Sequence, residues 1–109
     1  MSARSKARKR ALDILFECEI RRLPFGETIE ERQRTADAPL NPYTVTLVEG
    51  VAAQRERVDT VIGDFSHGWT LARMPAVDRN ILRIGVFEIL FNDDVPDEVA
   101  MSEAVSLAT

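Results

Sequence analysis

Residues 75–108, PAVDRNILRIGVFEILFNDDVPDEVAMSEAVSLA, carry more information about the fold than any other part of this chain. They read as an almost continuously apolar helix, a short acidic connection that ends at Pro96, and the start of a second helix. On the first helix Val77, Ile81 and Ile84 share one face, and further apolar side chains occupy other faces. A helix that is apolar on so many sides is expected to lie at the centre of a helical domain, with neighbours packed around it.

Apolar residues recur at helical spacing in the rest of the chain, and no segment shows sustained alternation, so the sequence predicts an all-α domain with almost no strand. The first helix is expected from about Arg4 to Arg22, where proline and glycine follow. Asn41 and Pro42 fit a capping residue followed by proline at the first helical position. A further helix is expected to carry Val58, Val61, Ile62 and Phe65 and to end at residues 66–68. Another is expected over 27–38, where Ile29 is almost the only apolar anchor.

The chain has 109 residues and forms one small domain, residues 1–109. Its composition, 45% hydrophobic and 29% charged, is typical of a soluble globular protein. We find no apolar run long enough for a membrane span and no apolar leader, so a cytoplasmic location is expected. A single cysteine, Cys18, excludes an internal disulfide.

The net charge of −4 conceals an uneven distribution. Five of the 14 basic residues lie in the first ten positions, where there is no acid, and the other 99 positions hold nine basic and 18 acidic residues. An acidic body repels a polyanion at long range, so nucleic-acid contact is expected to be local to this basic arm. The arm consists of Arg4, Lys6, Arg8, Lys9 and Arg10.

Closely spaced cations on one helix can reach successive phosphates and release condensed counterions. Farther along the same helix, Phe16 is expected to project towards the side of Lys6 and Lys9, where an aromatic ring could stack on an unpaired RNA base. The alternative is that Leu12, Phe16 and Ile20 form a second apolar stripe that packs within the domain.

The sequence gives little support for a catalytic site or a metal-binding site. Cys18 falls on the apolar face of the first helix and is expected to be a buried, inert thiol. His67 is the only histidine, so no zinc site of ordinary ligand number can form. The carboxylates of residues 93–98 fit the start of a helix better than a calcium loop. Glu88 lies within an apolar helical face, so a structural partner such as an arginine is expected. No cofactor is predicted.

The block from Asp78 to Glu103 resembles the NusB family of transcription antitermination factors. Its matching segments are Asp78-Arg79, Ile81-Leu82-Arg83, Phe87-Glu88-Ile89-Leu90, Asp94-Val95-Pro96 and Val99 to Val105, with further matches at Tyr43, Leu47, Gly50-Val51, Trp69 and Arg73-Met74. With the basic first helix, the resemblance covers nearly the whole chain.

This resemblance implies two packed helical subdomains and a non-enzymatic function. Members bind the boxA element of ribosomal RNA leader transcripts together with the ribosomal protein NusE, and join other Nus factors on RNA polymerase to suppress termination. Carried over by position, the expected RNA-binding residues are Arg4, Lys6, Arg8, Lys9, Arg10, Phe16 and Asp78.

Two departures from the family pattern bear on these expectations. Relatives often have tyrosine where this chain has Phe16, so a hydroxyl contact would be lost while stacking survives. The family also continues into a last helix that this chain, ending at Thr109, lacks. An uncovered apolar strip would then lower stability and favour a homodimer.

Two other functions remain open at this stage. The same fold resembles the RNA-binding accessory domain of some RNA cytosine methyltransferases. A helical module that binds only proteins, with an incidental basic arm, is the third possibility.

Overall fold

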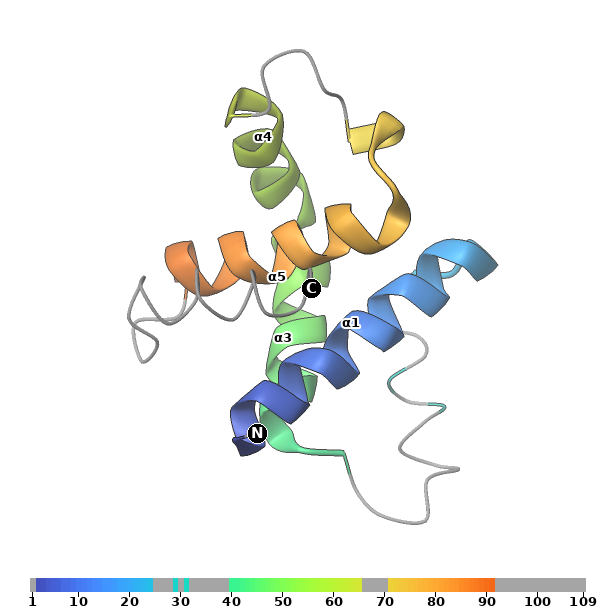
Figure 1. The fold of residues 1–109 in the computed structure, drawn as a ribbon, viewed down its shortest axis with the longest axis vertical. Helices are drawn as coiled ribbons and strands as arrows, with labels where there is room; N and C mark the ends of the chain where they lie inside the picture. Colours follow the sequence, from blue (N-terminus) through green and yellow to red (C-terminus); the bar gives the residue numbers. More distant parts are fainter. Residues whose placement is uncertain (1, 25–28, 30, 32–39, 66–70, 92–109) are drawn as a thin grey trace.

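The computed structural model describes residues 2–24, 29, 31, 40–65 and 71–91. Its regular elements there are α1 (Ala3–Arg21), α3 (Pro42–Ala53), α4 (Arg55–Phe65), the short 3-10 helix η1 (Leu71–Arg73) and α5 (Ala76–Phe91), as Figure 1 shows. Every regular element in these ranges is helical, which confirms the all-α prediction.

The ends of α1 and α3 follow from their local sequence. The side chain of Ser2 caps α1 by accepting a hydrogen bond from the backbone N–H of Ser5 at 3.1 Å. The same helix ends where Arg22 adopts the left-handed conformation, with φ of 58°. At the start of α3, Asn41 Oδ1 accepts from the backbone N–H of Tyr43 at 2.8 Å, and Pro42 is the first helical residue. Both predicted helix starts are confirmed to within about one residue.

Three predicted segments lie outside the described residues. They are the weak helix over 27–38, apart from Ile29 and Glu31, the end of the fourth predicted helix with His67 and Trp69, and everything that follows Phe91. Ile29 itself is described and is only 2% exposed, so the one apolar anchor expected in its segment does reach the core.

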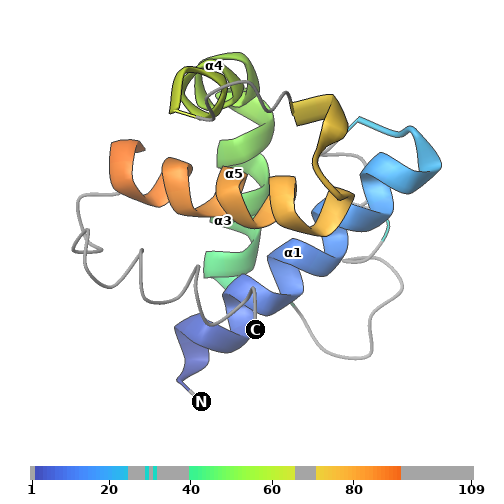
Figure 2. The ribbon, with the colours of Figure 1, turned by 45° about the horizontal axis from the view of Figure 1, so that its top comes forward.

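Helices α1 and α5 run side by side in opposite directions. The N-terminal half of α1 contacts the C-terminal half of α5 through Arg8 and Glu88, and the other two halves meet at Glu19 and Asn80. Helix α3 passes behind both, and α4 continues from it to pack on α5 and η1 (Figures 1 and 2). The buried core comprises Ala11, Leu12, Ile14, Leu15, Cys18, Ile29, Leu47, Val48, Val51, Val58, Ile62, Ile81, Ile84 and Phe87.

Helix α5 is less enclosed than its sequence predicts. Ile81, Ile84 and Phe87 are buried, as expected of a central helix. Leu82 and Ile89, in contrast, are 39% and 37% exposed. Among the described residues, α1, α3 and α4 pack against α5, so the expected neighbours are present on these three sides.

A polar network joins α1, α4, η1 and α5. Arg83 donates to both carboxylate oxygens of Asp59, at 2.8 and 3.1 Å, and to Asn80 Oδ1 at 2.9 Å. Asn80 donates to Glu19 at 2.7 Å, and Arg79 pairs with the same carboxylate and with backbone carbonyls at Leu71 and Met74. Because these buried polar groups are satisfied by one another, they fix α1, α4, η1 and α5 in one arrangement.

Gly50 lies in the middle of α3 because the ring of Phe87 from α5 occupies the space of a side chain there. We expect Gly50→Ala to lower the free energy of unfolding by about 1–3 kcal/mol through overpacking. Gly63 in α4 is the matched control, since nothing lies within 4 Å of a Cβ at that position. Gly63→Ala should instead raise stability by about 0.5–1 kcal/mol. Chemical denaturation of both variants tests this, and a Gly50→Ala protein as stable as Gly63→Ala would contradict the packing.

Candidate nucleic-acid interface

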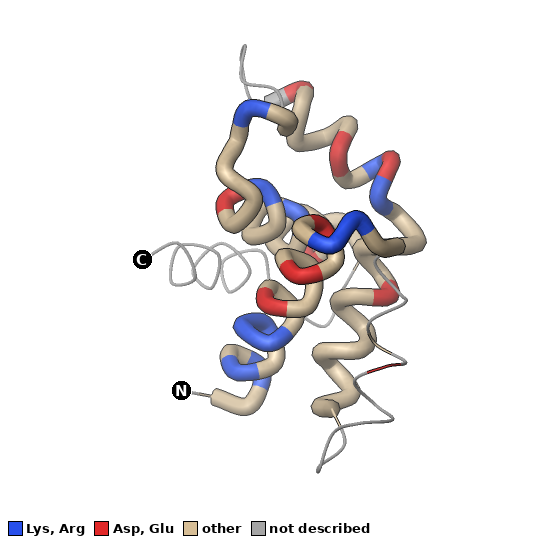
Figure 3. Tube along the Cα trace, turned by 90° about the vertical axis from the view of Figure 1, so that its right-hand side faces the viewer, with Lys and Arg blue, Asp and Glu red and all other residues tan. Residues whose placement is uncertain are grey.

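Five of the six basic residues of α1 gather at its N-terminal end, and acidic residues follow them along the helix (Figure 3). Arg4, Lys6, Lys9 and Arg10 are exposed. Arg8 differs from the expectation for this group, because its side chain is only 2% exposed. The sequence therefore placed five cations in one arm, and the structure divides them into four at the surface and one in the interior.

Helical geometry places Lys6, Lys9 and Arg10 on the outward face of α1, opposite the buried Ala7 and Ala11. We call Lys6, Lys9 and Arg10 the cationic face. Phe16 follows Lys9 by seven residues, so it lies two turns farther along on the same side. Its ring is partly exposed, while Leu12 of the alternative apolar stripe is buried and Ile20 is 62% exposed. Asp13 is the exposed acid on this side, and it moderates the positive charge between Lys9 and Phe16.

Arg8 binds a carboxylate inside the fold. Its Nε donates to both oxygens of Glu88 on α5, at 3.0 and 3.1 Å, and Glu88 is 1% exposed. The hydroxyl of Tyr43 on α3 donates to the same carboxylate at 2.5 Å. This triad, Arg8, Glu88 and Tyr43, joins three helices, and it confirms the expectation of an arginine partner for Glu88.

The triad also supports the position of an exposed cation. The Arg4 guanidinium carbon lies 4.4 Å from the centre of the Tyr43 ring, within the range of a cation–π contact. A further bond, from Thr44 Oγ1 to the carbonyl of Ala7 at 3.1 Å, ties the start of α3 to α1. Arg4 therefore rests on a ring whose own hydroxyl is held in the interior. In the sequence Tyr43 stood out as a match to the family pattern, with no sign of this contact.

Burial, followed by the hydrogen bond to Glu88, raises the pKa of Tyr43 from its ordinary value of 10.0 to about 12. Between these values the unfolded chain has released a proton that the folded chain keeps, so stability present below pH ~10 should fall as pH rises to ~12. Tyr43 is the only tyrosine in the chain, so tyrosinate absorbance reports this residue alone. In Tyr43→Phe the fall should be smaller. A tyrosinate midpoint near 10 in the folded protein would contradict the buried hydrogen bond.

Asp78 is exposed and lies in the first turn of α5, a position that the helix dipole favours for an acid. Because α1 and α5 run in opposite directions, this end of α5 lies near Glu19, and ten residues, or about 15 Å of helix, separate it from Glu88. The structure therefore does not bring Asp78 together with the cationic face, and its role in RNA binding stays a prediction.

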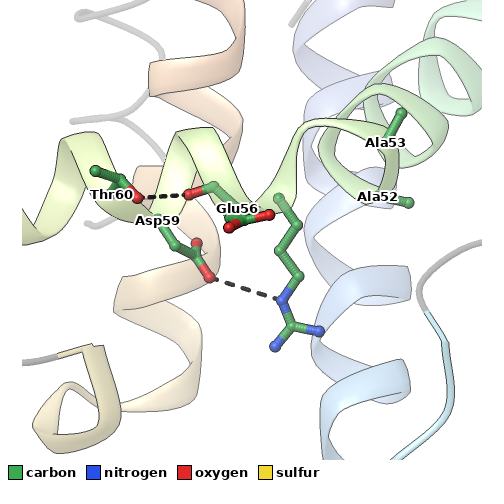
Figure 4. A pocket seen from close by; sticks show the side chains of 6 residues that line it. Ala52, Ala53, Glu56, Asp59 and Thr60 are labelled. Atoms are coloured by element: carbon green, nitrogen blue, oxygen red, sulfur yellow. Dashed lines mark hydrogen bonds and ion pairs between the residues drawn. The ribbon is translucent and has the colours of Figure 1, made fainter.

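Elsewhere, a shallow hollow of about 670 Å³ lies where α3 meets α4, shown in Figure 4. Two of its three charged lining residues are paired, because Asp59 binds Arg55 at 3.6 Å and also Arg83. Among the described residues, no three His, Cys, Asp or Glu side chains gather as metal ligands. No helix in the same ranges is long and apolar enough to cross a membrane. Cys18 is buried and forms no disulfide, as expected.

Comparison with known proteins gives consistent matches. The model of the NusB family matches residues 5–109. The chain is 56% identical over 108 residues to the transcription antitermination protein NusB of Arthrobacter sp. (strain FB24), which covers 99% of this chain and 79% of that protein. The NusB of Nocardioides sp. (strain ATCC BAA-499 / JS614) is 53% identical over 109 residues, covering 100% and 81%. The solved structure of T. maritima NusB superimposes with a TM-score of 0.85 at 30% identity, covering 98% of this chain and 77% of that one.

Proposed function

The chain belongs to the NusB family of transcription antitermination proteins, which are not enzymes, and we propose that its α1 helix binds single-stranded boxA RNA. In this proposal the ribosomal protein NusE binds the RNA jointly with it. The complex then joins other Nus factors on RNA polymerase in the cytoplasm and suppresses termination in ribosomal RNA operons.

The observation that carries the proposal is the cationic face. Lys6, Lys9 and Arg10 are exposed on one side of a helix of an otherwise acidic protein. Such an arrangement confines attraction for phosphates to that helix, because the acidic remainder repels a polyanion. Relatives more than half identical are named as antitermination proteins, which favours this function over that of a methyltransferase accessory domain.

Phe16 supplies a second, uncharged contribution. If its partly exposed ring stacks on a base, Phe16→Ala should weaken RNA binding by about 1–3 kcal/mol and leave the salt dependence of binding unchanged. Fluorescence anisotropy with a labelled RNA measures both quantities. A loss of about 3–5 kcal/mol of folding stability would instead show that Phe16 belongs to the core.

The proposed function is tested by binding to boxA RNA and to a scrambled RNA of the same composition, each with and without NusE. We expect boxA RNA to bind more tightly, and NusE to increase that preference. Equal affinity for both RNAs in the presence of NusE would contradict the proposal and favour a general RNA-binding module. Absence of RNA binding, with NusE still bound, would favour a module that binds only proteins.

A further inference from the structure

A groove of about 570 Å³ opens beside the N-terminal end of α1, between the start of α3 and the end of α5. Arg4, Tyr43 and Phe91 are among the residues that line it, and the exposed Asn41 and Thr46 add polar atoms. Among the described residues, these walls combine a cation with aromatic rings. Such a combination suits a planar, electron-rich ligand attached to a negative charge.

Arg4 has two features that set it apart from the cationic face. First, its guanidinium is held over the Tyr43 ring, whereas the expected partners of Lys6, Lys9 and Arg10 are solvent and phosphate. Second, the ring below it is fixed by the bond from its hydroxyl to Glu88, and Glu88 is fixed by Arg8. A guanidinium supported in this way loses little conformational freedom when a ligand covers its outer side.

Phe91 provides a second planar surface in the same groove. It is 38% exposed, and its ring stacks on the buried Phe87 ring with centroids 5.7 Å apart and an interplanar angle of 25°. The Arg57 guanidinium carbon also lies 5.9 Å from the centre of the Phe91 ring, so the ring is held between the core and a cation. A ring held in this way adds a fixed, partly exposed aromatic edge to the groove.

We propose that this groove is a base-binding subsite, in which an unpaired nucleobase of the bound RNA stacks on Arg4 as Arg4 rests on Tyr43. The inference rests on the proposed function, and it adds a site to it. The groove lies about 18 Å along α1 from Phe16, so it binds a different nucleotide of the same strand. Tyr43 acts here as a positioning residue, since it touches Arg4 and holds it in place.

The test uses Arg4→Lys, which keeps the charge and removes the planar surface from an exposed position. The probe is a boxA-containing RNA in which each nucleotide is replaced in turn by an abasic one. For the unchanged protein, we expect one abasic position to weaken binding by about tenfold through loss of a stacked base. Arg4→Lys should weaken binding of intact RNA by a similar factor, leave the salt dependence unchanged, and make that one position insensitive to base removal.

Tyr43→Leu should reproduce the Arg4→Lys pattern, and its thermal midpoint shows whether the fold survives. The inference is overturned if Arg4→Lys binds intact RNA as the unchanged protein does, or if base removal costs the same in both at every position. Failure of the proposed function looks different, because the unchanged protein would then bind none of these RNAs. That result would reject the proposed function and the base-binding subsite together.

Discussion

Replacing Glu88 by alanine should lower the free energy of unfolding by about 3–5 kcal/mol, because the change leaves the Arg8 guanidinium buried without its carboxylate. The magnitude follows from burial, since Arg8 and Glu88 are 2% and 1% exposed. It also reflects the Tyr43 hydroxyl, which donates to the same carboxylate. Such a loss is a large fraction of the stability of a small domain. Denaturation by urea, followed by circular dichroism, measures it.

The matched control is an ion pair at the surface. Glu17 pairs with Arg21 one turn away at 3.1 Å, with side chains that are 34% and 48% exposed. Glu17→Ala should cost less than about 1 kcal/mol. If Glu88→Ala costs no more than Glu17→Ala, then the buried pair is not important for stability.

A combined variant separates the pair's net contribution from the penalty of breaking it. Changing Arg8 to Met, Glu88 to Leu and Tyr43 to Phe together removes every polar side-chain group of the triad at once. Well-packed apolar replacements of buried ion pairs are often neutral, so this variant should recover most of the stability lost in Glu88→Ala. A combined variant as unstable as the single one would assign the effect to packing volume.

The fold could be predicted from the sequence where local chemistry alone decides the outcome. Asn41 and Pro42 start α3 because capping and the fixed φ of proline need no tertiary partner. The same is true of the end of α1 near Arg22. The burial of Cys18 followed from the apolar face of one helix. These features depend on residues close together in the chain.

The division of the basic arm could not be predicted in this way. Arg8 and Glu88 are 80 residues apart, and neither position identifies the other. One signal was present in the sequence, because Glu88 lay within an apolar face and required a partner. Arg8 was grouped with the exposed cations of the basic arm. Only the antiparallel packing of α1 on α5 brings the two residues together. The sequence alone therefore overestimated the number of exposed basic residues in the arm by one.

The motif residues Asp78, Arg79 and Arg83 show the same limitation. Their spacing indicated the family without indicating their roles. Arg79 and Arg83 prove to be members of the polar network with Glu19 and Asp59. Asp78 next to them stays exposed at the end of α5 remote from the cationic face. A matching motif shows that the chain belongs to the family. Burial, which the structure provides, then separates the residues that stabilise the fold from those that a ligand can reach.

Removing two residues of the cationic face should have the largest effect on RNA binding. Lys9→Ala combined with Arg10→Ala should weaken binding of single-stranded RNA on the order of 25-fold at ~0.1 M salt, if each cation neutralises one phosphate. Both side chains are exposed, so we expect the stability to be nearly unchanged. The measurement is fluorescence anisotropy with a labelled boxA RNA.

A control of equal charge comes from arginines elsewhere. Arg22 and Arg73 are exposed, one at the end of α1 and the other in η1. Alanine at both positions changes the net charge by the same amount without touching the cationic face. If this control variant loses as much RNA affinity as the variant with alanine at Lys9 and Arg10, then overall charge governs the affinity and the cationic face does not.

The most direct test of the central claim is the salt dependence of RNA binding. Arg4, Lys6, Lys9 and Arg10 are expected to contact phosphates, whereas Arg8 is buried. The slope of log affinity against log salt should therefore be about −2.8, so the affinity should fall about fifty-fold between ~50 and ~200 mM salt. The slope should fall to about −1.4 when Lys9 and Arg10 are replaced by alanine, and stay near −2.8 when Arg22 and Arg73 are replaced. A slope that is the same in all three proteins would contradict the assignment of RNA binding to the exposed side of α1.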